Sequence, residues 1–155
     1  AQFLKTTKAL EHRLENFFLK KNTLFVNDSK GTNVESTVKA IEAFKNKVVL
    51  IAGGENKKIC NDELIKKINE RVGFVYLIGE TGTILAEEMD KVGYKKYKNL
   101  GTLEKVLLDI RENIDFEDGQ TILFSPATAS FDQFKNFEER GRIFKELTNK
   151  ILGEK

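Results

Sequence analysis

The stretch VVLIAGG, residues 48–54, decides the fold class. Five apolar residues followed by two glycines are typical of a short strand that is buried on both faces and ends in a tight turn. Such a stretch is much too short to cross a bilayer. On both sides of it, strand-length apolar runs alternate with amphipathic helical stripes. This alternation predicts a parallel β-sheet covered by helices.

Upstream of this strand, the sequence predicts a hairpin and then a helix. Residues 13–27 contain two β-forming runs around a polar turn at residues 20–22. The helix that follows is expected to be capped by Thr32, with Glu35 at the spacing of a capping box, and to extend to Lys45.

The downstream half repeats the same pattern of strands and helices. We expect, in order, a helix capped by Asn61, a strand at 74–78, a helix at 83–92, a short strand at 94–97, a helix capped by Thr102, a strand at 120–125 and a last helix opened by Asn136. The predicted fold class is therefore α/β. It is a Rossmann-like, mostly parallel sheet with helices on both faces and an N-terminal antiparallel edge hairpin.

Composition narrows the class of protein. The chain has 155 residues, enough for one domain with its own core. Its 26 basic and 24 acidic residues are interspersed, which does not favour nucleic-acid binding or membrane insertion. The single cysteine, Cys60, fits a reducing cytoplasm, and with only one histidine a Cys/His zinc site is excluded. We expect a cytoplasmic monomer.

The polar loops that follow the strands are the candidate site, because ligands of open α/β sheets bind outside the carboxyl ends of the strands. In the first loop, Asp28 could accept from ribose hydroxyls, Lys30 could meet a phosphate or carboxylate, and Thr32 could donate to an anion at a helix start. The alternative makes Asp28 a turn residue, Thr32 a helix cap and Lys30 a solvated side chain. Spacing alone favours this alternative.

Two further places offer cationic candidates. After the glycine pair at residues 53–54, Lys57 could reach into the crevice, although such a pair is more often only a tight turn. His12 and Arg13 stand at the entrance of the domain as an exposed pair. Such a pair is usually mere surface, and the alternative is an arginine that contacts a nucleotide phosphate.

The loop after the last strand has small residues against which a ligand could lie. Ser130 adds a hydroxyl donor. Asn136 and Glu139 have the spacing of a capping box, which places Phe137 in the first helical turn, where its free backbone N–H suits a carboxylate. The alternative makes the phenylalanines core residues and Ser130 a turn residue, and both interpretations can hold together.

Two of these stretches also resemble motifs of a known family. NDSKGTNVEST at residues 27–37 and SPATASFDQFKNFEERG at residues 125–141 resemble the C-terminal domain of the Mur ligases, bacterial ATP-dependent amide ligases. HRLE at 12–15 and LIAGG at 50–54 fit in the right order, so the resemblance covers nearly the whole chain. Sister ligases carry a Tyr-Ala-His-like loop in place of residues 28–30. The likeness therefore favours the members that add D-glutamate.

The resemblance implies a domain organisation and a reaction. Residues 12–155 would be the amino-acid-binding domain, and residues 1–11 the tail of a central domain or a linker. The whole enzyme would join D-glutamate to UDP-N-acetylmuramoyl-L-alanine in peptidoglycan synthesis, through an acyl phosphate. ATP and Mg²⁺ would be bound mainly by the central domain, so this chain alone is expected to be inactive and to supply no metal ligand. The alternatives are a non-enzymatic ligand-binding module and a related ligase such as folylpolyglutamate synthetase.

The resemblance also implies roles for single residues. D-glutamate would be held by Thr32, Lys57, Ser130 and Phe137. The nucleotide would be faced by His12, Arg13, Asp28 and Lys30. The chain departs from the family pattern at Gly31, where alanine is more usual and where glycine should loosen the loop.

Overall fold

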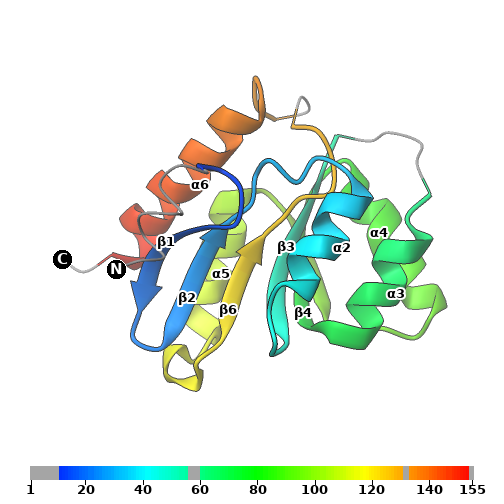
Figure 1. Cartoon of the computed structure of the whole chain (residues 1–155), viewed down its shortest axis with the longest axis horizontal. Coiled ribbons are helices and arrows are strands. Elements are labelled where there is room, and N and C mark those ends of the chain that lie inside the picture. Colours follow the sequence, from blue (N-terminus) through cyan, green and yellow to red (C-terminus); the bar gives the residue numbers. More distant parts are fainter. Residues whose placement is uncertain (1–10, 56–59, 131–132, 154–155) are drawn as a thin grey trace.

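The computed structural model of the chain describes residues 11–55, 60–130 and 133–153. The described residues form one sheet of six strands in the order β1-β2-β6-β3-β4-β5 (Figure 1). Only β1 and β2 pair antiparallel, and the other neighbouring strands run parallel. The predicted fold class, including the edge hairpin, is confirmed. The strands are β1 (Glu15–Lys20), β2 (Thr23–Asn27), β3 (Val48–Gly54), β4 (Val72–Gly79), β5 (Tyr97–Gly101) and β6 (Thr121–Phe124).

Helices cover both faces of this sheet (Figure 1). Strand β3 shows the division, since Leu50 and Ala52 belong to one apolar cluster and Val49 and Ile51 to the other. No helix in the three described ranges is long and apolar enough to span a membrane. The first cluster is covered by α2 (Val34–Glu42), α3 (Asp62–Arg71) and α4 (Thr81–Lys91), and the second by α5 (Leu103–Asn113), α6 (Phe137–Leu152) and the short 3₁₀ helix η1 (Phe116–Asp118).

The connections between strands change direction beside β6. The chain passes from β2 through α2 to β3 on one face, and it returns from β5 through α5 to place β6 between β2 and β3. The helices that follow β2 and β3 therefore lie on one face of the sheet, and the helix that follows β6 lies on the other. In open α/β sheets, a reversal of this kind marks the place at the carboxyl ends of the strands where ligands bind.

Two of the predicted helix caps form as expected. The hydroxyl of Thr102 accepts from the backbone N–H of Lys105, and the Asn136 side chain accepts from that of Glu139. A third cap was wrong. Asn33, not Thr32, begins α2 and accepts from Ser36 N at 2.8 Å. The capping pattern is thus shifted by one residue, and the helix starts one position later than predicted.

Other boundaries also differ from the prediction. Helix α2 ends at Glu42, short of Lys45, while α4 begins two residues early, at Thr81. Asn61 precedes α3 but makes no side-chain cap. The strand expected at 94–97 lies instead at 97–101, because Tyr94 closes the turn after α4 and its hydroxyl donates to the buried end of β4. Tertiary contacts of this kind leave no signal in the local pattern. The helical tail expected at residues 1–10 lies outside the described residues.

Phe144 should be a large contributor to stability. Its ring is fully buried on α6, with ring centroids 4.6 Å from Phe124 and 5.3 Å from Phe17. We predict that Phe144→Ala lowers the free energy of unfolding by about 3–5 kcal/mol, measured by urea denaturation. Leu19→Ala is the control, because Leu19 is 67% exposed and its truncation should cost less than about 0.5 kcal/mol. Equal losses in the two variants would contradict this account of the core.

Candidate functional site

Three strand-exit loops meet beside β6. We call them the β2 loop (residues 28–33), the β3 loop (which begins at Glu55) and the β6 loop (which begins at Ser125). The β6 loop is hydrogen-bonded to both neighbours: Ala127 N donates to Gly31 O at 2.8 Å, and Glu55 N donates to Ala129 O at 3.1 Å. The loops that were predicted from sequence to carry the site are therefore joined by backbone bonds.

Asp28 anchors the β2 loop. Its carboxylate is 4% exposed and accepts from Leu14 N at 3.0 Å and from Ser125 Oγ at 2.7 Å. Burial raises the pKa of the Asp28 carboxyl above its ordinary value, and these two hydrogen bonds act against that rise. Gly31 makes the contact possible, because a Cβ there would lie 2.6 Å from the Ser125 hydroxyl. Instead of loosening the loop, glycine lets it pack closely.

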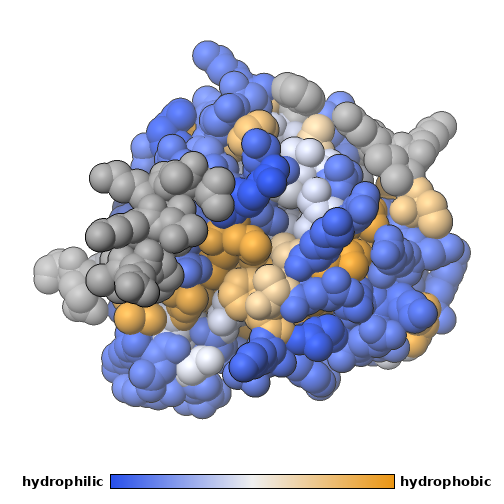
Figure 2. All heavy atoms as spheres, in the orientation of Figure 1, coloured by the Kyte–Doolittle hydropathy of each residue, from blue (hydrophilic) through white to orange (hydrophobic). Residues whose placement is uncertain are grey.

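Three of the four residues predicted to face a nucleotide line one cavity. It has a volume of about 370 Å³ and lies between the segment before β1 and helix α2. Arg13, Asp28 and Lys30 form one side, and Glu35 and Lys39 are on the other. Both Arg13 and Lys30 are exposed, so two cations are accessible to an anionic ligand. Figure 2 shows this face, where an apolar area at the centre is bordered by hydrophilic side chains.

The fourth residue, His12, was expected to be exposed, but it is buried. It is 6% exposed, and its ring packs between Asn27 and the start of α6. The Asn27 side-chain oxygen accepts from Ser29 N, which turns the amide nitrogen toward His12 Nδ1 at 2.9 Å. His12 Nδ1 is therefore the acceptor, and a neutral ring carries its proton on Nε2. Gly141 is required for this packing, because a Cβ there would lie 2.2 Å from the ring.

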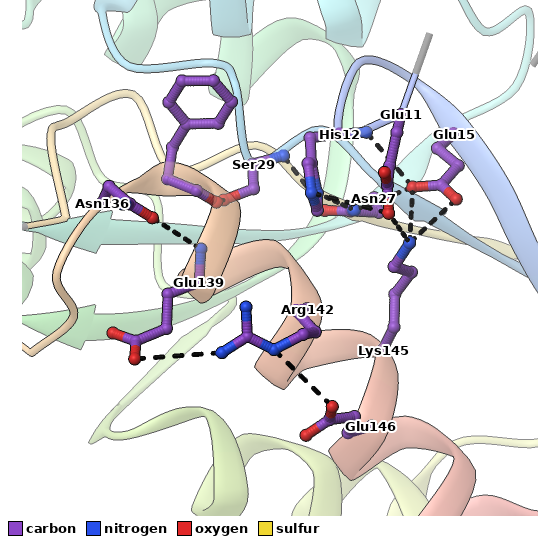
Figure 3. A network of polar contacts seen from close by, with 11 residues as sticks. Glu11, His12, Glu15, Asn27, Ser29, Asn136, Glu139, Arg142, Lys145 and Glu146 are labelled. Carbon is purple, nitrogen blue, oxygen red and sulfur yellow. Dashed lines mark hydrogen bonds and ion pairs between the residues drawn. The ribbon is translucent and has the colours of Figure 1, made fainter. Parts of the chain in front are cut away.

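A lysine ties α6 to the segment before β1 (Figure 3). Lys145 Nζ lies 2.8 Å from Glu11 and 3.0 Å from the nearer oxygen of Glu15. Glu11, His12 and Glu15 are the one group of metal-ligand type in the described ranges. In this structure both carboxylates of the group pair with the single ammonium of Lys145.

Of the residues predicted to hold an amino acid, Ser130 and Phe137 lie in or next to the β6 loop. Ser130 is 2% exposed, and Phe137 is the first residue of α6, where a backbone N–H has no partner within the helix. The capping box there is only half formed, since Glu139 accepts from Lys135 N instead of Asn136 N. The centroid of the Phe137 ring lies 5.8 Å from Lys30 Nζ, so the ring is close to the cavity that Lys30 lines.

The other two residues of this set have different outcomes. Thr32 is half-buried in the β2 loop. Because Asn33 caps α2, the hydroxyl of Thr32 is not needed for the helix. Lys57 lies outside the described residues.

Sequence reasoning missed Arg140 and Ser29. Arg140 is 1% exposed, donates from Nε and Nη2 to Ser29 Oγ and O, and donates from Nη1 to Thr128 O. A signal was available, because Arg140 stands one turn before Phe144 on the stripe that α6 buries. A charged residue in such a stripe indicates a buried polar network.

The family model described as Mur ligase, glutamate ligase domain, matches residues 12–128. The chain belongs to the Mur ligase family. The resemblance seen in the two loop motifs is thereby confirmed.

Relatives of this Mur ligase domain carry the same enzyme name. A protein of Fusobacterium nucleatum is 45% identical over 154 residues, covering 98% of this chain and 35% of its own length. One of Caldicellulosiruptor bescii is 39% identical over 152 residues, covering 97% and 33%. Both are named UDP-N-acetylmuramoylalanine–D-glutamate ligase. The chain thus spans about a third of the length of the relatives it matches.

Solved structures of Mur ligases share the fold. MurF of Thermotoga maritima, in complex with ADP, aligns with 90% of this chain and 31% of its own, with a TM-score of 0.53 and 18% identity. The murein peptide ligase Mpl of Psychrobacter arcticus aligns with 90% of this chain and 30% of its own, with a TM-score of 0.60 and 11% identity. At these identities the likeness concerns the fold alone.

The packing of His12 predicts a pH dependence of stability. Burial lowers the pKa of the His12 imidazole below its ordinary value, although the nearby Glu11 raises it. The unfolded chain then binds a proton at higher pH than the folded one, so stability present above about pH 6.5 is lost as the pH falls through the folded-state pKa. We predict that the urea midpoint of His12→Gln falls less between pH 7.5 and pH 5 than that of the wild type. The difference between the two proteins should correspond to the titration of one histidine.

The comparison isolates His12 because all other titrating groups are common to both proteins. Parallel midpoint curves for the wild type and His12→Gln would contradict the neutral, acceptor role assigned to the ring.

Proposed function

We propose that this chain is the amino-acid-binding domain of an ATP-dependent ligase that joins D-glutamate to UDP-N-acetylmuramoyl-L-alanine. The observation that carries the proposal is the set of relatives with this name, 35–45% identical along nearly the whole chain. The loops that meet beside β6 support it, because backbone hydrogen bonds join the loop that carries Lys30 to the loop that carries Ser130.

In the proposed reaction, the substrate carboxylate is first phosphorylated by ATP. The amine of D-glutamate then attacks the acyl phosphate, and phosphate leaves from a tetrahedral intermediate. The task of this domain is to place the amine near the reacting carbon. Holding a reactant in this way removes an entropic part of the barrier.

For the amino acid, the proposed contacts fall at two places. Ser130 and the backbone N–H of Phe137 would bind one carboxylate, with the dipole of α6 favouring the negative charge. Thr32 and Lys57 would bind the other. The backbone bonds between the loops support a shared crevice for the two places, and a dicarboxylate amino acid needs two such separated sites.

For the nucleotide, the proposed contacts lie in the cavity beside α2. Arg13 and Lys30 would meet phosphate, and Asp28 would accept from ribose while its carboxylate also holds the loop. His12 would act through its backbone, since its carbonyl accepts from Lys30 N at 2.8 Å. The triphosphate and Mg²⁺ would be bound mainly by the central domain of the enzyme.

The test uses the full-length ligase of which this chain is a part. Phosphate release is measured with ATP, UDP-N-acetylmuramoyl-L-alanine and each of a panel of D- and L-amino acids. D-glutamate should be the substrate, whereas L-glutamate should not. Preference for another amino acid, or no amino-acid-dependent release, would overturn the proposal.

The isolated chain should behave differently from the full enzyme. We predict that the 155-residue chain, given the same substrates, releases no phosphate in a D-glutamate-dependent manner, because the proposed triphosphate grip is outside it. The same assay with full-length enzyme is the positive control. Turnover by the isolated chain would show that it holds a complete active site.

Ser130→Ala in the full enzyme tests the amino-acid contacts. The loss of one donor should raise the KM for D-glutamate by an amount equivalent to roughly 1–3 kcal/mol of binding. Thr121→Ala is the control, since it removes a hydroxyl at the opposite end of β6 from the β6 loop. If Ser130→Ala leaves the KM for D-glutamate unchanged, Ser130 does not belong to the site.

A further inference from the structure

A buried hydroxyl links the two halves of the proposed site. Ser29 is 0% exposed, and its Oγ donates to Phe137 O at 2.8 Å while it accepts from Arg140 Nε at 2.9 Å. A serine hydroxyl has one proton to give and lone pairs to accept with, so both bonds can form at once. Figure 3 shows Ser29 beside the first turn of α6.

The arginine completes the link. The guanidinium of Arg140 also donates to Ser29 O at 2.6 Å and to Thr128 O at 2.9 Å. Its planar fork therefore holds the β2 loop and the β6 loop from a single point on α6. Arg140 follows Phe137 by three residues, so the same helical turn carries both the fork and the N–H proposed to bind a carboxylate.

We propose that Ser29 and Arg140 are positioning residues that hold the amino-acid-binding end of α6 in register with the nucleotide-facing loop. This inference rests on the function proposed above. Ser29 stands between Asp28 and Lys30, which are assigned to the nucleotide, and it bonds to Phe137, which is assigned to D-glutamate. Both side chains are buried, and the groups they bond to include Phe137 O, Thr128 O and each other's polar atoms, so their role is assigned to positioning.

Loss of the hydroxyl has a specific consequence. Without it, Phe137 O and Arg140 Nε lose a partner in a region sheltered from water, and buried polar groups without partners are costly. The first turn of α6 then relaxes away from the β2 loop. Because the N–H of Phe137 moves with that turn, binding of the amino acid should weaken more than binding of the other substrates.

The experiment compares two full-length variants that each delete one buried hydroxyl bonded to a carbonyl of α6. Ser29→Ala removes the link. Thr148→Val removes the hydroxyl that donates to Phe144 O at 2.7 Å, two turns further along the helix from the site. KM for D-glutamate, KM for ATP, kcat and the melting temperature are measured for both variants and the wild type.

Ser29→Ala should raise the KM for D-glutamate about five- to twentyfold, with KM for ATP and kcat changed less than about twofold. Thr148→Val should leave all kinetic constants near wild type, because the Thr148 hydroxyl bonds only within α6 and away from the loops. Ser29→Thr, which restores a hydroxyl, should recover part of the affinity. If Ser29→Ala turns over D-glutamate with wild-type KM, or if Thr148→Val shifts that KM as much, the inference is overturned while the proposed function stands.

Should Ser29→Ala fail to fold, Arg140→Lys carries the same test. Lysine keeps the charge and loses the fork, so the KM for D-glutamate should again rise selectively, and an unchanged value overturns the inference. A wild-type enzyme that does not use D-glutamate overturns the proposed function and this inference with it.

Discussion

The candidate site depends on one buried guanidinium. The side chain of Arg140 extends from α6, and its guanidinium donates to main-chain or hydroxyl oxygens of Ser29 and Thr128. A charge that would be costly to bury is thereby surrounded by acceptors. These acceptors belong to loops that follow two different strands. Close approach in the same area also requires Gly54, where a Cβ would lie 2.2 Å from the Thr128 hydroxyl. Several loops with no regular structure of their own are thereby given one defined arrangement.

Helix α6 serves both the site and the entrance of the domain. Toward the crevice it presents Arg140 and its first turn. Toward β1 and the segment before it, α6 presents Gly141, which admits the His12 ring, and Lys145, which pairs with Glu11 and Glu15. His12 and the β2 loop are in turn connected by the bond from Lys30 N to His12 O. A displacement of α6 would therefore move both the segment around His12 and the loops that Arg140 holds.

Features set by local pattern could be predicted, and those set by distant partners could not. The buried strand at 48–54 and the caps at Thr102 and Asn136 follow from nearest neighbours in sequence, and they were predicted correctly. Tyr94 was misassigned to a strand because its hydroxyl is satisfied by a carbonyl of β4. The buried stripe of α6 could have indicated that Arg140 is buried, but not its partner Ser29, which is 111 residues away along the chain. Family motifs located the loops, but they did not show which side chains hold them together.

The position of β6 has a consequence for how the domain folds during its synthesis. Strand β6 is the last of the six described strands in sequence, yet it lies between β2 and β3, which do not pair with each other. Until residues 121–124 have emerged from the ribosome, the hairpin β1–β2 and the block β3–β5 have no common strand. The six-stranded sheet can form only after β6 has been synthesised. Until then the edges of β2 and β3 that β6 later covers are open, and open strand edges favour aggregation.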